Sequence, residues 1–182
     1  MVERIAQIVV LAEDAEQANL ARHYLIRCGH HQRNIVVRLA PQGQGSGEQY
    51  VRERYPLEVA YYRNRSTSRK AALMVGPDCD TGTVEEHERE LDRALVASSE
   101  AKREAAEEIA LLLPKRNIET RVLCLSGGAV DEVTNYKGTR NNGALIKPAA
   151  VTLYEWSRTG STVPASCVPS LRKGLIEVRR IG

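Results

Sequence analysis

Short apolar runs that alternate with amphipathic segments constrain the fold of this chain more than any other feature. The runs cover residues 5–12 (IAQIVVLA), 34–40 (NIVVRLA) and 71–76 (AALMVG). They are rich in β-branched and aliphatic residues and are too short for buried helices, so they predict strands that are buried on both faces. Helical spacing of apolar residues follows the first run, at residues 15–28. Strands that alternate with helices predict a mostly parallel sheet.

The second half of the chain continues this pattern and then departs from it. A fourth strand is expected to begin at Ile109 and to end before Pro114, and a helix (IETRVLCL) follows it. Two further helices are expected at 144–157 and 168–180. The predicted class is therefore α/β, with a Rossmann-like, mostly parallel sheet of about four strands, helices on both faces and C-terminal helices. We assign residues 1–128 to the α/β core and residues 129–182 to a helical extension packed on it.

Two helix starts carry recognisable caps. Ser46 is expected to cap a helix over about 48–63, which Pro56 should interrupt or split, because proline removes a backbone hydrogen bond. Thr83 is expected to cap the next helix, and Glu86 stands at the capping-box position.

Charge, cysteine spacing and the N-terminal segment limit the kinds of function and location expected for this chain. The net charge of +3 permits contact with nucleic acid but does not require it. The four cysteines lie far apart and the chain has no CxxC or Cys/His ligand spacing, which argues against a zinc site and against a disulfide framework. The N-terminal apolar run reaches acidic residues too early for a signal peptide or a membrane span. We therefore expect a cytoplasmic protein that does not contact membranes.

Acidic side chains follow two of the predicted strands. Glu13 follows the first strand, and Asp78 and Asp80 follow the third. Carboxyl ends of parallel strands meet at one edge of a sheet, where ligands bind in folds of this class. Carboxylates are the protein ligands that Mg²⁺ prefers, and two ions could bind where three carboxylates meet. A purely structural interpretation stays open, since the helix dipole favours acids at helix starts.

The residues around these acids resemble the TOPRIM domain of topoisomerases, primases and small phage-defence nucleases. The resemblance covers residues 11–25 (LAEDAEQANLARHYL) and 72–95 (ALMVGPDCDTGTVEEHERELDRAL), and more weakly residues 112–125. The chain departs from the pattern at Asp14, where the family more often has glycine, and at Pro77. The first departure leaves open whether Glu13 or Asp14 is the functional acid.

The resemblance implies a role for each matching residue. Glu13 would be the general acid/base or a metal ligand, and Asp78 and Asp80 the metal-binding pair. Lys115 and Glu119 would be supporting members of the catalytic site. The implied activity is a nuclease dependent on Mg²⁺ or Mn²⁺, with DNA a more expected target than RNA. An ATPase partner and a homo-oligomer are also compatible with the family.

Two other functions remain open. The segment IVVLAEDAEQANLARHYLIRCG resembles the start of a response-regulator receiver domain. In that case the acidic pair after the first strand would bind Mg²⁺, Asp78 or Asp80 would be phosphorylated, and Lys115 would be the lysine that follows a late strand. A third hypothesis is a binding or assembly subunit that has kept the TOPRIM-like fold but is catalytically inactive.

Basic residues and histidines indicate a functional site less strongly than the acidic residues do. Lys115 and Arg116 follow the fourth strand and should lie near the acidic edge, where they could offset phosphate charge. Lys137 and Arg140 lie in a late polar loop. His87 is expected on a helix face, on the same stripe as neighbouring apolar residues.

Overall fold

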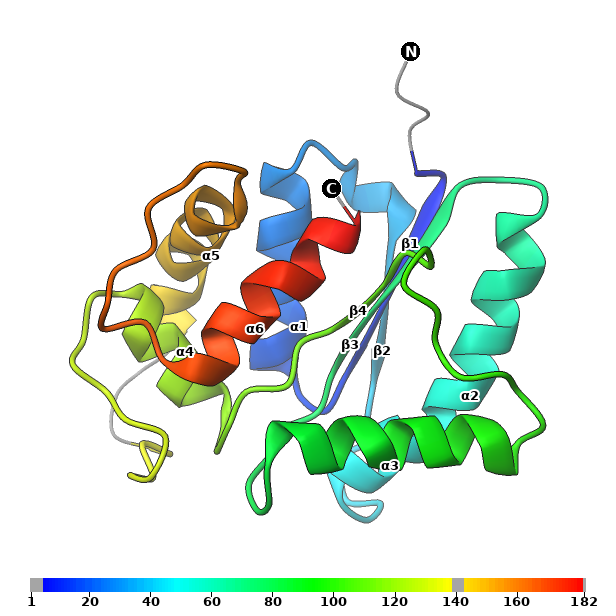
Figure 1. Cartoon of the computed structure of the whole chain (residues 1–182), viewed down its shortest axis with the longest axis horizontal. Coiled ribbons are helices and arrows are strands. Elements are labelled where there is room, and N and C mark those ends of the chain that lie inside the picture. The colour runs from blue at the N-terminus through cyan, green and yellow to red at the C-terminus, as the bar shows by residue number, and fades with distance from the viewer. Residues whose placement is uncertain (1–4, 139–142, 182) are drawn as a thin grey trace.

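A parallel sheet with helices on both faces forms the centre of the molecule (Figure 1). The structure is a computed structural model that describes residues 5–138 and 143–181. Within these residues, four strands pair in parallel in the order β2-β1-β3-β4. The strands are β1 (Gln7–Ala12), β2 (Ile35–Leu39), β3 (Ala71–Gly76) and β4 (Ile109–Leu111). The predicted α/β fold class is confirmed.

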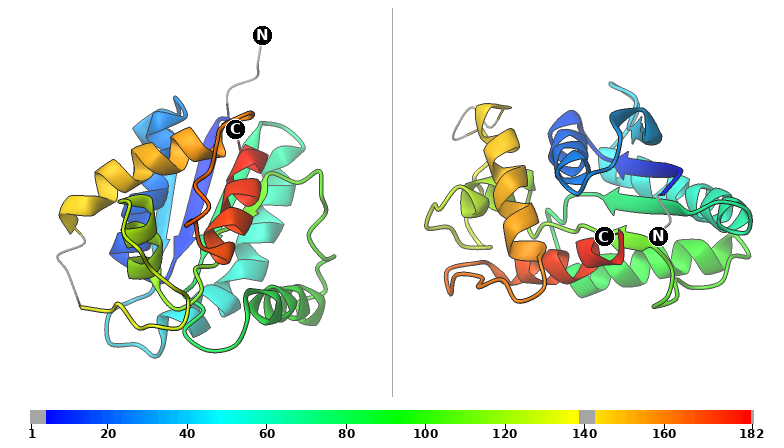
Figure 2. Two further views of the ribbon diagram at one scale, coloured as in Figure 1. Left: turned by 60° about the vertical axis from the view of Figure 1, so that its left-hand side comes forward. Right: turned by 90° about the horizontal axis from the view of Figure 1, so that it is seen from above.

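Helices α2 and α3 cover one face of the sheet, and α1, α5 and α6 cover the other (Figures 1 and 2). The helices are α1 (Ala15–Arg27), α2 (Gly47–Ser66), α3 (Val84–Ala97), α4 (Ile118–Leu125), α5 (Gly143–Ser157) and α6 (Pro169–Val178), with short 3₁₀ helices η1 (Gln32–Asn34) and η2 (Arg179–Ile181). The helices expected after Pro114 and near the C-terminus are thus present.

The core is divided by the sheet into two apolar clusters. Strand β3 contributes to both, because successive side chains of a strand point to opposite faces. Ala72 and Met74 pack with α1, α5 and α6, whereas Leu73 and Val75 pack with α2 and α3. The chain has no phenylalanine, and the fully buried Tyr55 of α2 is the largest side chain of the second cluster.

Helix α2 differs from its prediction. It runs without a break from Gly47 to Ser66 and contains Pro56, so the expected interruption is wrong. The helix buries Val51, Tyr55 and Val59 along one face. Burial of these side chains against the sheet outweighs the backbone hydrogen bond that proline removes.

The C-terminal helices complete the core. Helix α5 packs against α1, and α6 packs beside the edge strand β4. The buried carboxylate of Glu177, in α6, accepts a hydrogen bond from the backbone N–H of Leu111 in β4 (2.9 Å) and pairs with Arg103. Across residues 5–138 and 143–181, we find no helix that combines the length and the apolar character needed to cross a membrane.

Candidate metal centre

The acids predicted from the sequence lie where the strand order reverses. Strand β2 lies on one side of β1, and the chain then crosses to β3 on the other side of β1. The switch point, where the direction of strand addition reverses, therefore lies between β1 and β3. Ala12 and Gly76, the last residues of these strands, are paired in register. Glu13 follows the first directly, and Asp78 follows the second after one proline.

Hydrogen bonds join Glu13 to Asp78. The backbone N–H of Asp78 donates to Glu13 Oε2 (3.0 Å). Gln17, in the first turn of α1, connects both residues: its Oε1 accepts from the backbone N–H of Glu13 (3.1 Å), and its Nε2 donates to Asp78 Oδ1 (2.5 Å). Gln17 could not be selected from the sequence, because a single glutamine in a helix belongs to no recognisable motif.

The pKa values of Glu13 and Asp78 are both raised, because both acids are at least partly buried and several carboxylates lie close together. Burial, followed by the charges of Glu13 and Asp14, raises the pKa of Asp78 to about 8, although the bond from Gln17 opposes the shift. Burial also raises the pKa of Glu13, and the backbone hydrogen bond from Asp78 opposes it. The exposed Asp80 adds to the repulsion on both. A cation at this edge would relieve that repulsion.

The start of α2 lies directly against Glu13. A Cβ atom at Gly47 would stand only 2.1 Å from Glu13 Cγ, so a side chain at position 47 would displace the glutamate. Glycine at this position therefore lets the backbone of α2 approach the acidic pair closely. The contact also brings Glu48, the next residue, to the same edge of the sheet.

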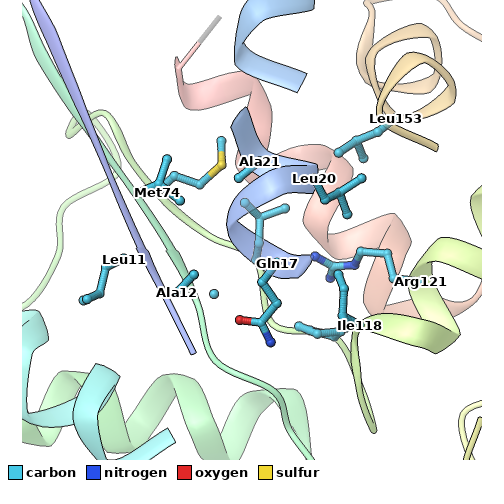
Figure 3. Close-up of a pocket in the computed structure, with 13 residues that line it drawn as sticks. Leu11, Ala12, Gln17, Leu20, Ala21, Met74, Ile118, Arg121 and Leu153 are labelled. Carbon is cyan, nitrogen blue, oxygen red and sulfur yellow. The ribbon is translucent and has the colours of Figure 1, made fainter. Parts of the chain in front are cut away.

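A small cavity of about 30 Å³ lies beside Gln17, the residue that is hydrogen-bonded to both acids (Figure 3). Gln17 and Arg121 are its polar lining residues, and the rest of the lining is mainly aliphatic. Arg121 is 2% exposed, and its Nε and Nη2 atoms have no hydrogen-bond partner among the described residues. Burial lowers the pKa of this guanidinium to about 10, and the charge of Asp78 opposes the shift. A buried guanidinium with two nitrogen atoms that have no partner among the described residues thus lines the cavity beside Gln17.

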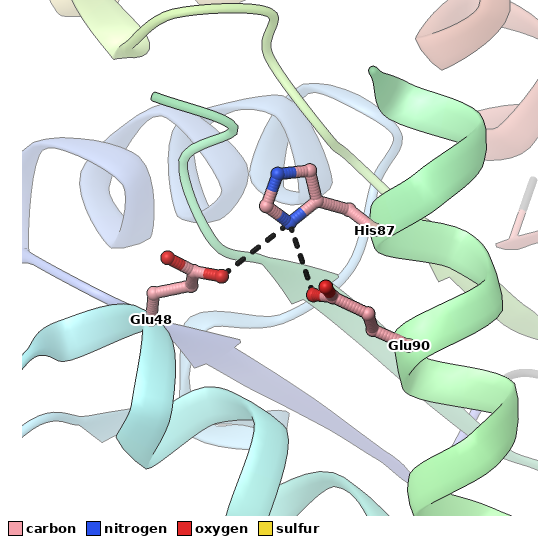
Figure 4. Close-up of side chains that lie close together, drawn as sticks. All are labelled: Glu48, His87 and Glu90. Atoms are coloured by element: carbon pink, nitrogen blue, oxygen red, sulfur yellow. Dashed lines mark ion pairs between the residues drawn. The ribbon is translucent and has the colours of Figure 1, made fainter. Parts of the chain in front are cut away.

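A second cluster combines two carboxylates with a histidine (Figure 4). Glu48 comes from α2, and His87 and Glu90 come from α3. One donor atom from each lies within 4.8 Å of the other two, close enough to hold a metal ion. In the part of the chain that the structure describes, no other group of three acidic, histidine or cysteine side chains meets this distance. Glu13, Asp78 and Asp80 therefore form a looser set.

The remaining predicted residues have different surroundings. Lys115 pairs with Cys79 through a backbone bridge, and its Nζ donates to the carbonyl of Gly82, so it lies beside the acidic turn. Glu119 is buried in the first turn of α4, and none of the contacts described joins it to Glu13 or Asp78.

The late loop is described only in part. The positive charge of Lys137 lowers the pKa of Glu13, against the larger effect of burial, whereas Arg140 lies outside the described residues.

Sequence reasoning missed the histidine cluster. His87 is buried on the apolar stripe of α3, as expected, yet its ring also faces carboxylates. His87 and Glu90 stand three residues apart, a spacing that places both on one helix face and could have indicated half of the site. Glu48 could not have been found in this way, because only the packing of α2 beside α3 brings it there.

Comparison with known proteins yields no relative. No family model, no curated protein and no solved structure matches this chain. The functional argument therefore depends on the residues of the chain and their geometry.

Proposed function

We propose that this protein is a TOPRIM-like phosphodiesterase that hydrolyses nucleic acid, with DNA a more expected target than RNA and with Mg²⁺ or Mn²⁺ as its cofactor. The observation that supports the proposal best is the meeting of Glu13 and Asp78 at the switch point of the sheet, 3.0 Å apart between Oε2 and N. The family resemblance extends the proposal to an ATPase partner.

Each residue has a distinct part in the proposed reaction. Asp78 and Asp80 would hold the cation, and Glu13 would accept the proton of the attacking water or complete the coordination. Bound Mg²⁺ supplies charge stabilisation and a more acidic water. Water would attack phosphorus and give its proton to Glu13, the P–O bond to the leaving strand would break, and the leaving oxygen would take a proton from solvent. Lys115 would offset phosphate charge after its Nζ leaves the carbonyl of Gly82.

Burial of Asp78 argues against this residue as the phosphate acceptor of a receiver domain. The residue is 4% exposed and is hydrogen-bonded to Gln17. A phosphate-accepting carboxylate must reach its donor, so the receiver hypothesis needs the exposed Asp80 as the acceptor.

Nicking of supercoiled plasmid in Mg²⁺ or Mn²⁺ tests the proposal. Glu13→Gln and Asp78→Asn should each lower the rate by about 100-fold or more, because each removes a carboxylate from the reaction centre. Asp92→Asn is the matched control, since Asp92 lies on α3 in a long ion pair with Lys102 (3.9 Å) and should retain the wild-type rate.

The nuclease proposal would be abandoned if the wild-type protein cleaved neither DNA nor RNA in either metal, alone or with its ATPase partner. Equal rates for Asp78→Asn and Asp92→Asn would instead show that any cleavage comes from elsewhere.

A further inference from the structure

The ring of His87 is held in one orientation. Its Nε2 lies 2.6 Å from the carbonyl oxygen of Thr81, in the loop before α3. A carbonyl only accepts hydrogen bonds, so Nε2 carries the proton. In the neutral ring this leaves Nδ1 with a free lone pair. The side chain is 8% exposed, and the packing around it keeps Nδ1 directed at Glu48 and Glu90 (Figure 4).

Distances from Nδ1 to the two carboxylates suit an intervening cation. Glu48 Oε1 lies 3.4 Å and Glu90 Oε2 lies 3.6 Å from Nδ1. Both separations exceed those of an N–H···O hydrogen bond, which are about 2.7–3.2 Å. Ligand atoms around a tetrahedral ion with bonds of about 2.1 Å stand roughly 3.4 Å from one another.

The two carboxylates have only a weak counter-ion in the structure. Arg52 Nη1 lies 3.9 Å from Glu48 Oε1 and 3.8 Å from Glu90 Oε2, and its side chain is 43% exposed. Within residues 5–138 and 143–181, neither carboxylate accepts a hydrogen bond. An exposed ion pair at this distance contributes little free energy, so Arg52 can be displaced by a better ligand for these oxygens.

We propose that Glu48, His87 and Glu90 bind a divalent transition metal, with Zn²⁺ and Co²⁺ preferred over Mg²⁺. An imidazole ligand favours these metals, whereas Mg²⁺ prefers oxygen ligands only. The bond from His87 to Thr81 is the outer contact that commonly orients a metal-bound histidine. Three protein ligands leave a further coordination position for water or a phosphate oxygen.

The bound metal would connect α2 to α3. His87 and Glu90 lie one helical turn apart on α3, and Glu48 lies in the first turn of α2. None of the three belongs to the set formed by Glu13, Asp78 and Asp80, so the inference is independent of the proposed nuclease.

Titration of the metal-free protein with Co²⁺, followed by visible absorption, tests the site. Glu90→Gln and Glu48→Gln should each weaken binding at least about tenfold, because each removes one ligand. Arg52→Gln should tighten it about two- to fivefold, because the competing charge is removed. Glu53→Gln, an exposed change on α2, should bind Co²⁺ as the wild type does.

Thermal unfolding provides a readout that is independent of colour. Saturating Zn²⁺ should raise the Tm of the wild type more than that of Glu90→Gln, since a ligand bound only to the folded state stabilises it in proportion to its affinity. Both changed glutamates are partly exposed, so the variants should fold. Equal Co²⁺ affinities for Glu90→Gln and Glu53→Gln would overturn the proposal.

Discussion

At the scale of single residues, Asp78 has a strongly raised pKa, because it is buried beside other acids at the carboxyl edge of the sheet. Its pKa is 3.8 in an unstructured chain and about 8 in the fold. Between these values the folded protein holds a proton that the unfolded chain has released. Protonation of Asp78 thus favours the folded state. This contribution to the free energy of unfolding is complete below pH 3.8 and is lost as pH rises through 8, because the folded state then loses the proton.

Asp78→Asn should therefore flatten the pH dependence of stability. In metal-free buffer the variant should exceed the wild type by on the order of 2 kcal/mol near pH 9, because its amide carries no charge to bury. The difference should shrink towards about pH 5, where the wild-type side chain is protonated. Urea unfolding at several pH values measures it. Parallel profiles for the two proteins would contradict the raised pKa.

At the scale of secondary-structure elements, α3 shows how local signals specify a helix. Thr83 accepts from the N–H of Glu86 (3.1 Å), and Glu86 accepts from the N–H of Thr83 (2.6 Å), so the predicted capping box is confirmed. Gly82, at φ +74, makes the turn that brings the chain into the cap. All of these residues are neighbours in the chain, so the sequence alone could reveal them.

Thr83→Ala should lower the free energy of unfolding by about 1 kcal/mol, because one backbone N–H at the start of α3 loses its partner. Denaturant unfolding measures the change. Thr162→Ala, in an exposed loop, is the control and should have no effect. A loss of the same size in both variants would assign the effect to threonine removal in general.

At the scale of the whole molecule, the C-terminal segment stabilises the edge of the sheet. Glu177 is buried, and its carboxylate joins α6 to β4 through the N–H of Leu111 and to the connection before β4 through Arg103. An edge strand presents unpaired backbone groups, and here a side chain from a distant helix satisfies one of them.

Glu177→Gln should therefore lower the free energy of unfolding by about 3 kcal/mol, because Arg103 would lose its charged partner while still largely buried. Calorimetry or urea unfolding would show this. Glu155→Gln, an exposed change on α5, should leave the stability near the wild-type value. A similarly small change in Glu177→Gln would show that α6 is held by apolar packing alone.

The sequence by itself determined the alternation of strands and helices, the cap at Thr83 and the acids after β1 and β3. These features depend on residues within about one or two helical turns of one another, and such patterns are visible in the chain.

Only the tertiary structure decided which distant side chains meet. The parallel order β2-β1-β3-β4 brings Glu13 beside Asp78, the packing of α2 beside α3 brings Glu48 to His87, and α2 continues through Pro56. The free energy of these contacts comes from burial between elements far apart in the chain, which no local pattern records.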